Sequence, residues 1–157
     1  MSTKIEVDQQ QAANEVENLT HKFKDLTAQW KAEESVAKAS GDTVAAAKAR
    51  YEGLSQTLEV QKQRIQALQR EREAMQNEMR SSATITKEQT DELNRLDRSL
   101  TSTTNKLTSL SNQQARAKRS FEYVSSGLKE LRNDYYTNNR AIDSHIEKLK
   151  AEGNTAE

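Results

Sequence analysis

Cysteine and proline are absent from the 157 residues, glycine occurs four times, and aromatic residues make up 4% of the chain. Without cysteine the chain has no disulfides, no thiolate metal sites and no cysteine nucleophile. Hydrophobic residues amount to 33%, too few to line a globular core of ordinary density. The 24 basic and 24 acidic residues balance, and the lack of proline argues against simple disorder. This composition predicts an elongated helical protein with a narrow apolar stripe and excludes most enzyme architectures.

Long apolar runs are also missing. No stretch approaches the roughly 18 uninterrupted apolar residues of a membrane-spanning helix, and the first residues contain no apolar signal region. We therefore expect a soluble protein, made in the cytoplasm, with no membrane contact from this segment. Because the formal net charge is zero, no broad electrostatic attraction to nucleic acid is expected either.

What the chain does contain is a heptad pattern, in which apolar residues recur at alternating steps of four and three. A strict 3.5-residue period keeps one stripe of a helix facing its partners and is typical of coiled coils. The first run predicts a helix–helix seam formed by Val16, Leu19, Phe23, Leu26, Trp30, Tyr51, Leu54, Leu58, Ile65 and Leu68. The second run continues the seam with Leu93, Leu96, Leu100, Leu107, Leu110, Phe121, Val124, Leu128, Leu131, Tyr135, Ile142 and Leu149.

A Ser/Thr-rich segment separates the two runs and breaks the heptad phase. Ser81 and Ser82 lie in it, and Thr86 with Gln89 three residues later forms a capping box that starts a new helix. We therefore predict an extended segment over residues 1–9, a first long helix over 10–79, a reversal loop over 80–86, a second long helix over 87–150 and a disordered tail over 151–157. The fold class is all-α, an elongated antiparallel coiled-coil hairpin.

Gly41 leaves one choice of architecture open. Within residues 40–43, Gly41 could end one helix in the left-handed conformation and Asp42 could cap the next. The heptad phase nevertheless continues through both residues. An unbroken first helix would give a two-helix hairpin with a hinge at Gly41. A broken first helix would give a three-helix arrangement.

Candidate chemistry is sparse. His21 and His145 are the two histidines, and neither has neighbours at metal-ligand spacing. No phosphate-binding loop or nucleophile motif is present, so we predict no catalytic residue, no metal site and no cofactor. The informative polar residues are those that interrupt the apolar stripe. Each weakens a coiled coil and either specifies its register or oligomeric state, or leaves a thin stripe that is partly solvated or awaits another protein. These residues are Glu33, Gln61, Arg72, Thr103, Gln114, Asn138 and His145.

Four segments carry a resemblance to a known family: residues 26–34 (LTAQWKAEE), 39–42 (ASGD), 47–54 (AKARYEGL) and 58–68 (LEVQKQRIQAL). They resemble the N-terminal region of tail tape measure proteins of long-tailed bacteriophages, especially those of Gram-positive hosts. Over residues 5–150 as a whole the resemblance is more general and less distinctive than in these four segments. It implies a structural, non-enzymatic helical protein that lies inside the tail tube and sets tail length during assembly.

The partners that this resemblance implies are other copies of the chain, tail assembly chaperones and tail tube proteins. It also implies a location in the host cytoplasm during assembly and in the lumen of the tail tube in the virion. Full-length members of the family are several times longer, so we expect this chain to be an N-terminal fragment. No individual functional residue transfers, because the family's function is distributed along a rod.

A cytoplasmic coiled-coil binding module, or a holdase-like chaperone, is the alternative function. The two hypotheses differ in where they place exposed apolar surface. A ruler is expected to bury its stripe evenly along its length, whereas a client-gripping hairpin is expected to expose apolar residues at its tip, around Ile85 and the Met75–Met79 end.

Overall fold

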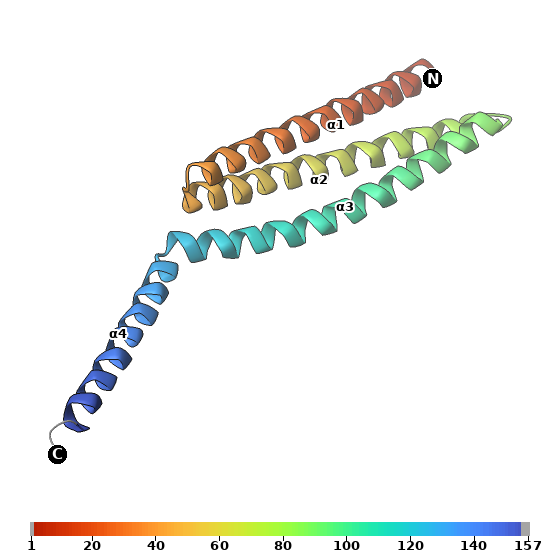
Figure 1. The fold of residues 1–157 in the computed structure, drawn as a ribbon. Coiled ribbons are helices and arrows are strands. Elements are labelled where there is room, and N and C mark those ends of the chain that lie inside the picture. Colours follow the sequence, from red (N-terminus) through yellow and green to blue (C-terminus); the bar gives the residue numbers. More distant parts are fainter. Residues whose placement is uncertain (1, 155–157) are drawn as a thin grey trace.

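The computed structural model describes residues 2–154, and the side chains of residues 7–153 within them. Four helices follow one another: α1 (Ser2–Ala39), α2 (Thr43–Ser81), α3 (Lys87–Ser125) and α4 (Leu128–Asn154) (Figure 1). The all-α prediction is confirmed. Helix α1 already begins at Ser2, so the predicted extended segment over residues 1–9 is wrong over the residues described. An isolated strand would have no neighbour for its backbone hydrogen bonds, whereas each added helical turn satisfies its own.

The chain breaks at Gly41, which settles the choice that the sequence left open. Gly41 has a φ of 77°, a left-handed conformation that glycine adopts without a steric penalty. Asp42 then caps α2, its carboxylate accepting a 2.8 Å hydrogen bond from the Ala45 backbone N–H. The segment predicted as one helix over 10–79 is therefore two antiparallel helices, and the three-helix arrangement is the one adopted.

The reversal between α2 and α3 is confirmed where the sequence placed it. Helix α2 ends at Ser81, and Ser82 donates its backbone N–H to the Glu78 carbonyl as the C-cap. The predicted capping box at the start of α3 is present in both directions. The Gln89 backbone N–H donates to the Thr86 hydroxyl, and the Thr86 backbone N–H donates to the Gln89 side chain.

A third break, at Ser126 and Gly127, interrupts the helix predicted over 87–150. Gly127 has a φ of 70° and ends α3 in the left-handed conformation, and α4 starts at the next residue. The heptad phase runs through this break, which is why periodicity alone predicts a continuous helix. The predicted tail over 151–157 is also shorter than expected, because α4 continues to Asn154, and residues 155–157 lie outside the described part.

Helix α2 lies between α1 and α3 and packs against both (Figure 1). The backbones of α1 and α3 make no close approach to each other within the described residues. Helix α4 meets only the end of α3 and projects away from the other three helices (Figure 1). We refer to α1–α3 as the body. The molecule is thus a three-helix body with a single helical arm.

Two apolar clusters hold the body together. One contains Trp30, Leu54 and Ala117, from α1, α2 and α3 respectively, with Tyr51 and Leu110 packed against it. The other contains Leu68, Met75 and Leu96, with Val16 of α1 and other half-buried side chains around it. Each cluster draws residues from all three helices, so α2 is bound on two faces.

The α1-facing side of α2 is lined by small and β-branched residues spaced seven apart. Ala46, Gly53, Val60 and Ala67 on this face are all buried. At Gly53 the Trp30 side chain is so close that an added Cβ would lie 2.1 Å from the Trp30 Cβ. A side chain larger than hydrogen at position 53 would force the two helices apart, so glycine here permits their close packing.

Candidate helix-association surface

The predicted seam divides into two parts with different surroundings. From Val16 to Val124, every predicted seam residue is buried or half-buried in the body, including Leu58, Ile65, Leu100, Leu107 and Phe121. From Leu128 onward the same heptad positions are exposed. They are Leu128, Leu131, Tyr135, Ile142 and Leu149, with exposed fractions between 51% and 66%. The second part packs against no helix within the described chain.

Polar seam residues of the body are paired with one another. Gln61 is fully buried, and its Nε2 donates a 3.1 Å hydrogen bond to the backbone carbonyl of Thr103, which is also buried. Across the same interface the Gln114 amide donates to the Ser55 hydroxyl at 3.2 Å. A one-heptad slip of α3 along α2 would separate Gln114 from Ser55 and move the small Thr103 away from the buried Gln61, so these contacts favour the observed register.

Ion pairs reinforce both interfaces of α2. Arg70 pairs with Glu15 of α1, with 2.8 Å between Nη2 and Oε1, and Arg72 pairs with Asp97 of α3. At the other end of the α1–α2 pair, the nearly buried Glu34 lies 3.7 Å from Arg50 Nη1. These contacts place charged residues beside the apolar stripe, as in coiled coils, where they select partner and orientation.

Glu71 is the most unusual charged residue of the body. Its side chain is almost fully buried, and its Oε1 lies 3.9 Å from Arg95 Nη2. Burial raises the pKa of the Glu71 carboxyl above its ordinary value, with Arg95 acting in the opposite direction. Arg95 also forms a hydrogen bond with Glu92, which lowers the pKa of Glu92. This cluster was not predicted, because Glu71 lies off the predicted seam.

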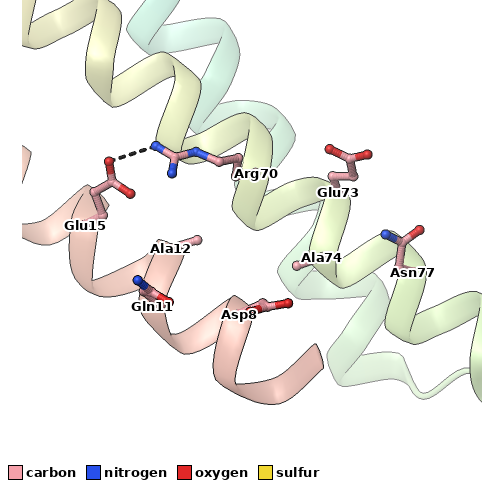
Figure 2. Close-up of a pocket in the computed structure, with 8 residues that line it drawn as sticks. All are labelled: Asp8, Gln11, Ala12, Glu15, Arg70, Glu73, Ala74 and Asn77. Carbon is pink, nitrogen blue, oxygen red and sulfur yellow. Dashed lines mark hydrogen bonds and ion pairs between the residues drawn. The ribbon is translucent and has the colours of Figure 1, made fainter. Parts of the chain in front are cut away.

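Figure 2 shows a groove of about 370 Å³ on the surface between the start of α1 and the end of α2. Asp8, Gln11, Ala12 and Glu15 line it from α1, and Arg70, Glu73, Ala74 and Asn77 line it from α2. The Glu15–Arg70 ion pair spans one end of the groove. Ala12 and Ala74 face each other at its floor, so the groove exists because small residues meet here between longer polar ones.

His21 and His145, the two histidines considered as metal ligands, are both exposed and lie on different elements, α1 and α4. The described side chains contain no group of three or more histidine, cysteine, aspartate or glutamate residues that could hold a metal ion. Among the described helices, none combines the length and apolar character needed to cross a bilayer.

Exposed apolar side chains of the body, such as Val36 and Val44 beside the α1–α2 turn, are scattered, whereas those of α4 follow one heptad stripe. This stripe consists of Leu128, Leu131, Tyr135, Ile142, Ile146 and Leu149, and we call it the arm stripe. Ile146, which is 43% exposed, was not part of the predicted seam and flanks it on one side. The sequence could have indicated this residue, because Ile146 lies four residues after Ile142 and therefore on the same helical face.

The tip between α2 and α3 exposes much less apolar surface than the arm. Ile85 is 56% exposed, but Met75 is buried and Met79 is half-buried against the second apolar cluster. The arrangement thus matches neither expectation in full: the predicted apolar seam is buried or half-buried throughout the body, and its exposed residues lie on α4 and not at the tip.

Comparison with protein-family models, with curated proteins and with solved structures finds no match to this chain.

Proposed function

We propose that this chain is a structural, non-enzymatic component of a bacteriophage tail, a segment of a tape measure protein that acts by helix–helix association. The resemblance of residues 26–68 to that family motivates the proposal. The observation that carries it is the arm stripe, which continues the heptad phase of the packed seam of α3 yet lies exposed on α4. Such a stripe is built to be covered by another helix.

The shape of the molecule supports the same role. Helices α1–α3 run side by side with no bulky domain, and α4 extends the molecule further (Figure 1). In the single-helix arm the rise per residue is constant, so residue number converts linearly into length, as a ruler requires. In this proposal the chain assembles in the host cytoplasm, resides in the tail lumen of the virion, and contacts itself, tail assembly chaperones and tail tube proteins.

Helix α4 is the place to test the ruler role, because it can be lengthened without disturbing the body. Inserting two further copies of residues 128–141 after Ala141 preserves the heptad phase and adds about 42 Å of helix at 1.5 Å per residue. In the phage that encodes the chain, we expect mean tail length, measured by electron microscopy, to increase by about that amount.

Deleting residues 128–141 is the matched control, with an expected shortening of about 21 Å at the same rise per residue. Mass spectrometry of purified virions should detect peptides of the chain in both cases. Tails of unchanged length in both variants, or virions and tail intermediates without the chain, would contradict the proposal.

The alternative, a helical binding module or holdase-like chaperone, makes a different prediction about the tip. With Met75 buried and Met79 half-buried, only Ile85 offers a large apolar side chain there. A holdase that works through its tip should lose its suppression of client aggregation on Ile85→Ser. One that uses the arm should lose it on Leu131→Ser instead. If neither variant differs from the parent chain, or the parent does not suppress aggregation, this alternative fails.

A further inference from the structure

The arm stripe follows the heptad spacing of one side of a two-stranded coiled coil. Leu128, Tyr135, Ile142 and Leu149 occupy one core position of successive heptads, and Leu131, Asn138 and His145 occupy the other. All seven side chains are exposed. An amphipathic helix in water gains most of its stability from packing of its apolar face, so α4 lacks within the described chain the contacts that would stabilise it.

We propose that the partner of α4 is the α4 of a second copy of this chain, paired antiparallel. This inference rests on the proposed role of the arm as a helix-association surface and names the partner of that surface. In antiparallel pairs, the two core positions of the heptad face each other across the interface. One register places Leu131 opposite Leu149 of the second copy. Tyr135 then faces His145, and Asn138 faces Ile142.

The charges that flank the arm stripe select this register. In it, Asp134 of each copy lies beside Lys148 of the other, which gives two symmetry-related ion pairs. No ion pair within the described chain uses either residue, so both are available. Shifting the register by one heptad in either direction sets Asp134 beside Ala141, or moves it beyond the described residues, and loses both pairs.

A parallel pair lacks these ion pairs, because it would set Asp134 beside Asn139. It would bring Asn138 against Asn138, where the two amides can hydrogen-bond to each other, and His145 against His145. It would also bring both three-helix bodies to the same end of the arm, where α3 meets α4 (Figure 1). The antiparallel pair places the two bodies at opposite ends, so the arms can overlap over most of their length without a collision.

Charge exchange tests the partner and the register together in the full chain. Sedimentation equilibrium should find a dimer whose dissociation constant rises about tenfold in Asp134→Lys and about tenfold in Lys148→Asp, since each replaces two attractive contacts by repulsive ones. The double exchange Asp134→Lys/Lys148→Asp should restore the parent dissociation constant. Asn133→Asp, on the outer face of α4, should leave it unchanged.

Orientation is tested by spin labels, which are simple to place because the chain has no cysteine of its own. In the antiparallel pair, labels at Lys129→Cys lie about 33 Å apart along the axis at 1.5 Å per residue, whereas labels at Arg140→Cys lie at nearly the same height. In a parallel pair, the two sites would give similar short distances.

Three results would overturn the inference: a monomer at every accessible concentration, a double exchange that does not rescue dimerisation, or similar short distances at both labelled sites. A failure of this kind leaves the proposed tail role to be decided by the tail-length experiment, because that experiment measures assembly in the virion and does not depend on the register of α4.

Discussion

Gly53 decides how close α1 and α2 can lie, and it does so through Trp30. Glycine inside a helix costs about 0.5–1 kcal/mol relative to alanine, so its presence here needs a packing reason. The indole packed directly over Gly53 supplies that reason, since no Cβ fits in the remaining space. The sequence does not predict this role of Gly53, because a close approach between two helices has no local signal.

We expect Gly53→Ala to lower the free energy of unfolding by about 1–3 kcal/mol, because overpacking at the Trp30 contact outweighs the better helix propensity of alanine. Urea unfolding followed by circular dichroism measures the change. Gly153→Ala is the matched control: an added Cβ there meets nothing within 4 Å, so that variant should be as stable as the parent or slightly more so. A stabilised Gly53→Ala variant would show that α1 and α2 can separate at no cost.

Glu71 gives the body a stability that depends on pH. Burial raises the pKa of its carboxyl, so the folded chain binds the proton more tightly than the unfolded chain does. The stabilising contribution of the protonated form is therefore fully present below the unfolded pKa and is lost as pH rises through the folded pKa. Among the described residues, the charged partner of this buried carboxyl is Arg95, at 3.9 Å, so the ionised form of Glu71 is poorly compensated.

Glu71→Gln should accordingly raise the free energy of unfolding at pH 7, and its advantage over the parent chain should shrink as the pH falls towards 4. Arg95 keeps Glu92 as a partner in this variant. Denaturant titrations at both pH values measure the difference, with the exposed Glu73→Gln as control. If Glu71→Gln is less stable than the parent at pH 7, the attraction between Glu71 and Arg95 outweighs the burial penalty.

At the scale of elements, the sequence predicted the helical structure and the reversal between α2 and α3 well, but not the number of helices. The heptad stripe identified the buried faces from Val16 to Val124, and the capping box at Thr86 placed the start of α3. Both signals are local or strictly periodic, which is why they can be read without a structure. The breaks were harder, because Gly41 and Gly127 interrupt the backbone without shifting the heptad phase.

The second packed face of α2 was not predicted at all. A helix in the middle of three needs two apolar faces, and the α1-facing one consists of Ala46, Gly53, Val60 and Ala67. Small residues bury little area, so a search for large apolar residues passes over them. Their spacing of seven was nevertheless present in the sequence and predicts close helix packing once the third helix is known.

Gly127 controls whether the arm is a separate element. Alanine is disfavoured at a φ of 70° by roughly 1–2 kcal/mol, and the few contacts between α3 and α4 offer little resistance to straightening. Gly127→Ala should therefore convert α3 and α4 into one helix. Double spin labels at Arg116→Cys and Lys150→Cys should then approach the separation of a straight helix, about 51 Å at 1.5 Å per residue. An unchanged distance accompanied by lower stability would mean that the bend is held by more than glycine.

At the scale of the whole molecule, the body and the arm differ in how they are stabilised. The body has two apolar clusters, buried amide pairs and ion pairs on both sides of α2, and each of these lies within α1–α3. Over the residues that the structure describes, the arm has none of these contacts. Folding of the body should therefore be nearly independent of the arm, whereas the arm should depend on a partner.

A chain ending at Ser126 tests this independence. Its thermal unfolding midpoint should lie within a few degrees of the value for the body in the full chain, because the deletion removes almost no packed surface. Circular dichroism of the full chain should show a second, earlier loss of helix that depends on protein concentration, because the arm is stabilised by association. A body that melts far earlier after truncation would mean that α4 contributes to its core, and a concentration-independent first transition would mean that the arm is stable alone.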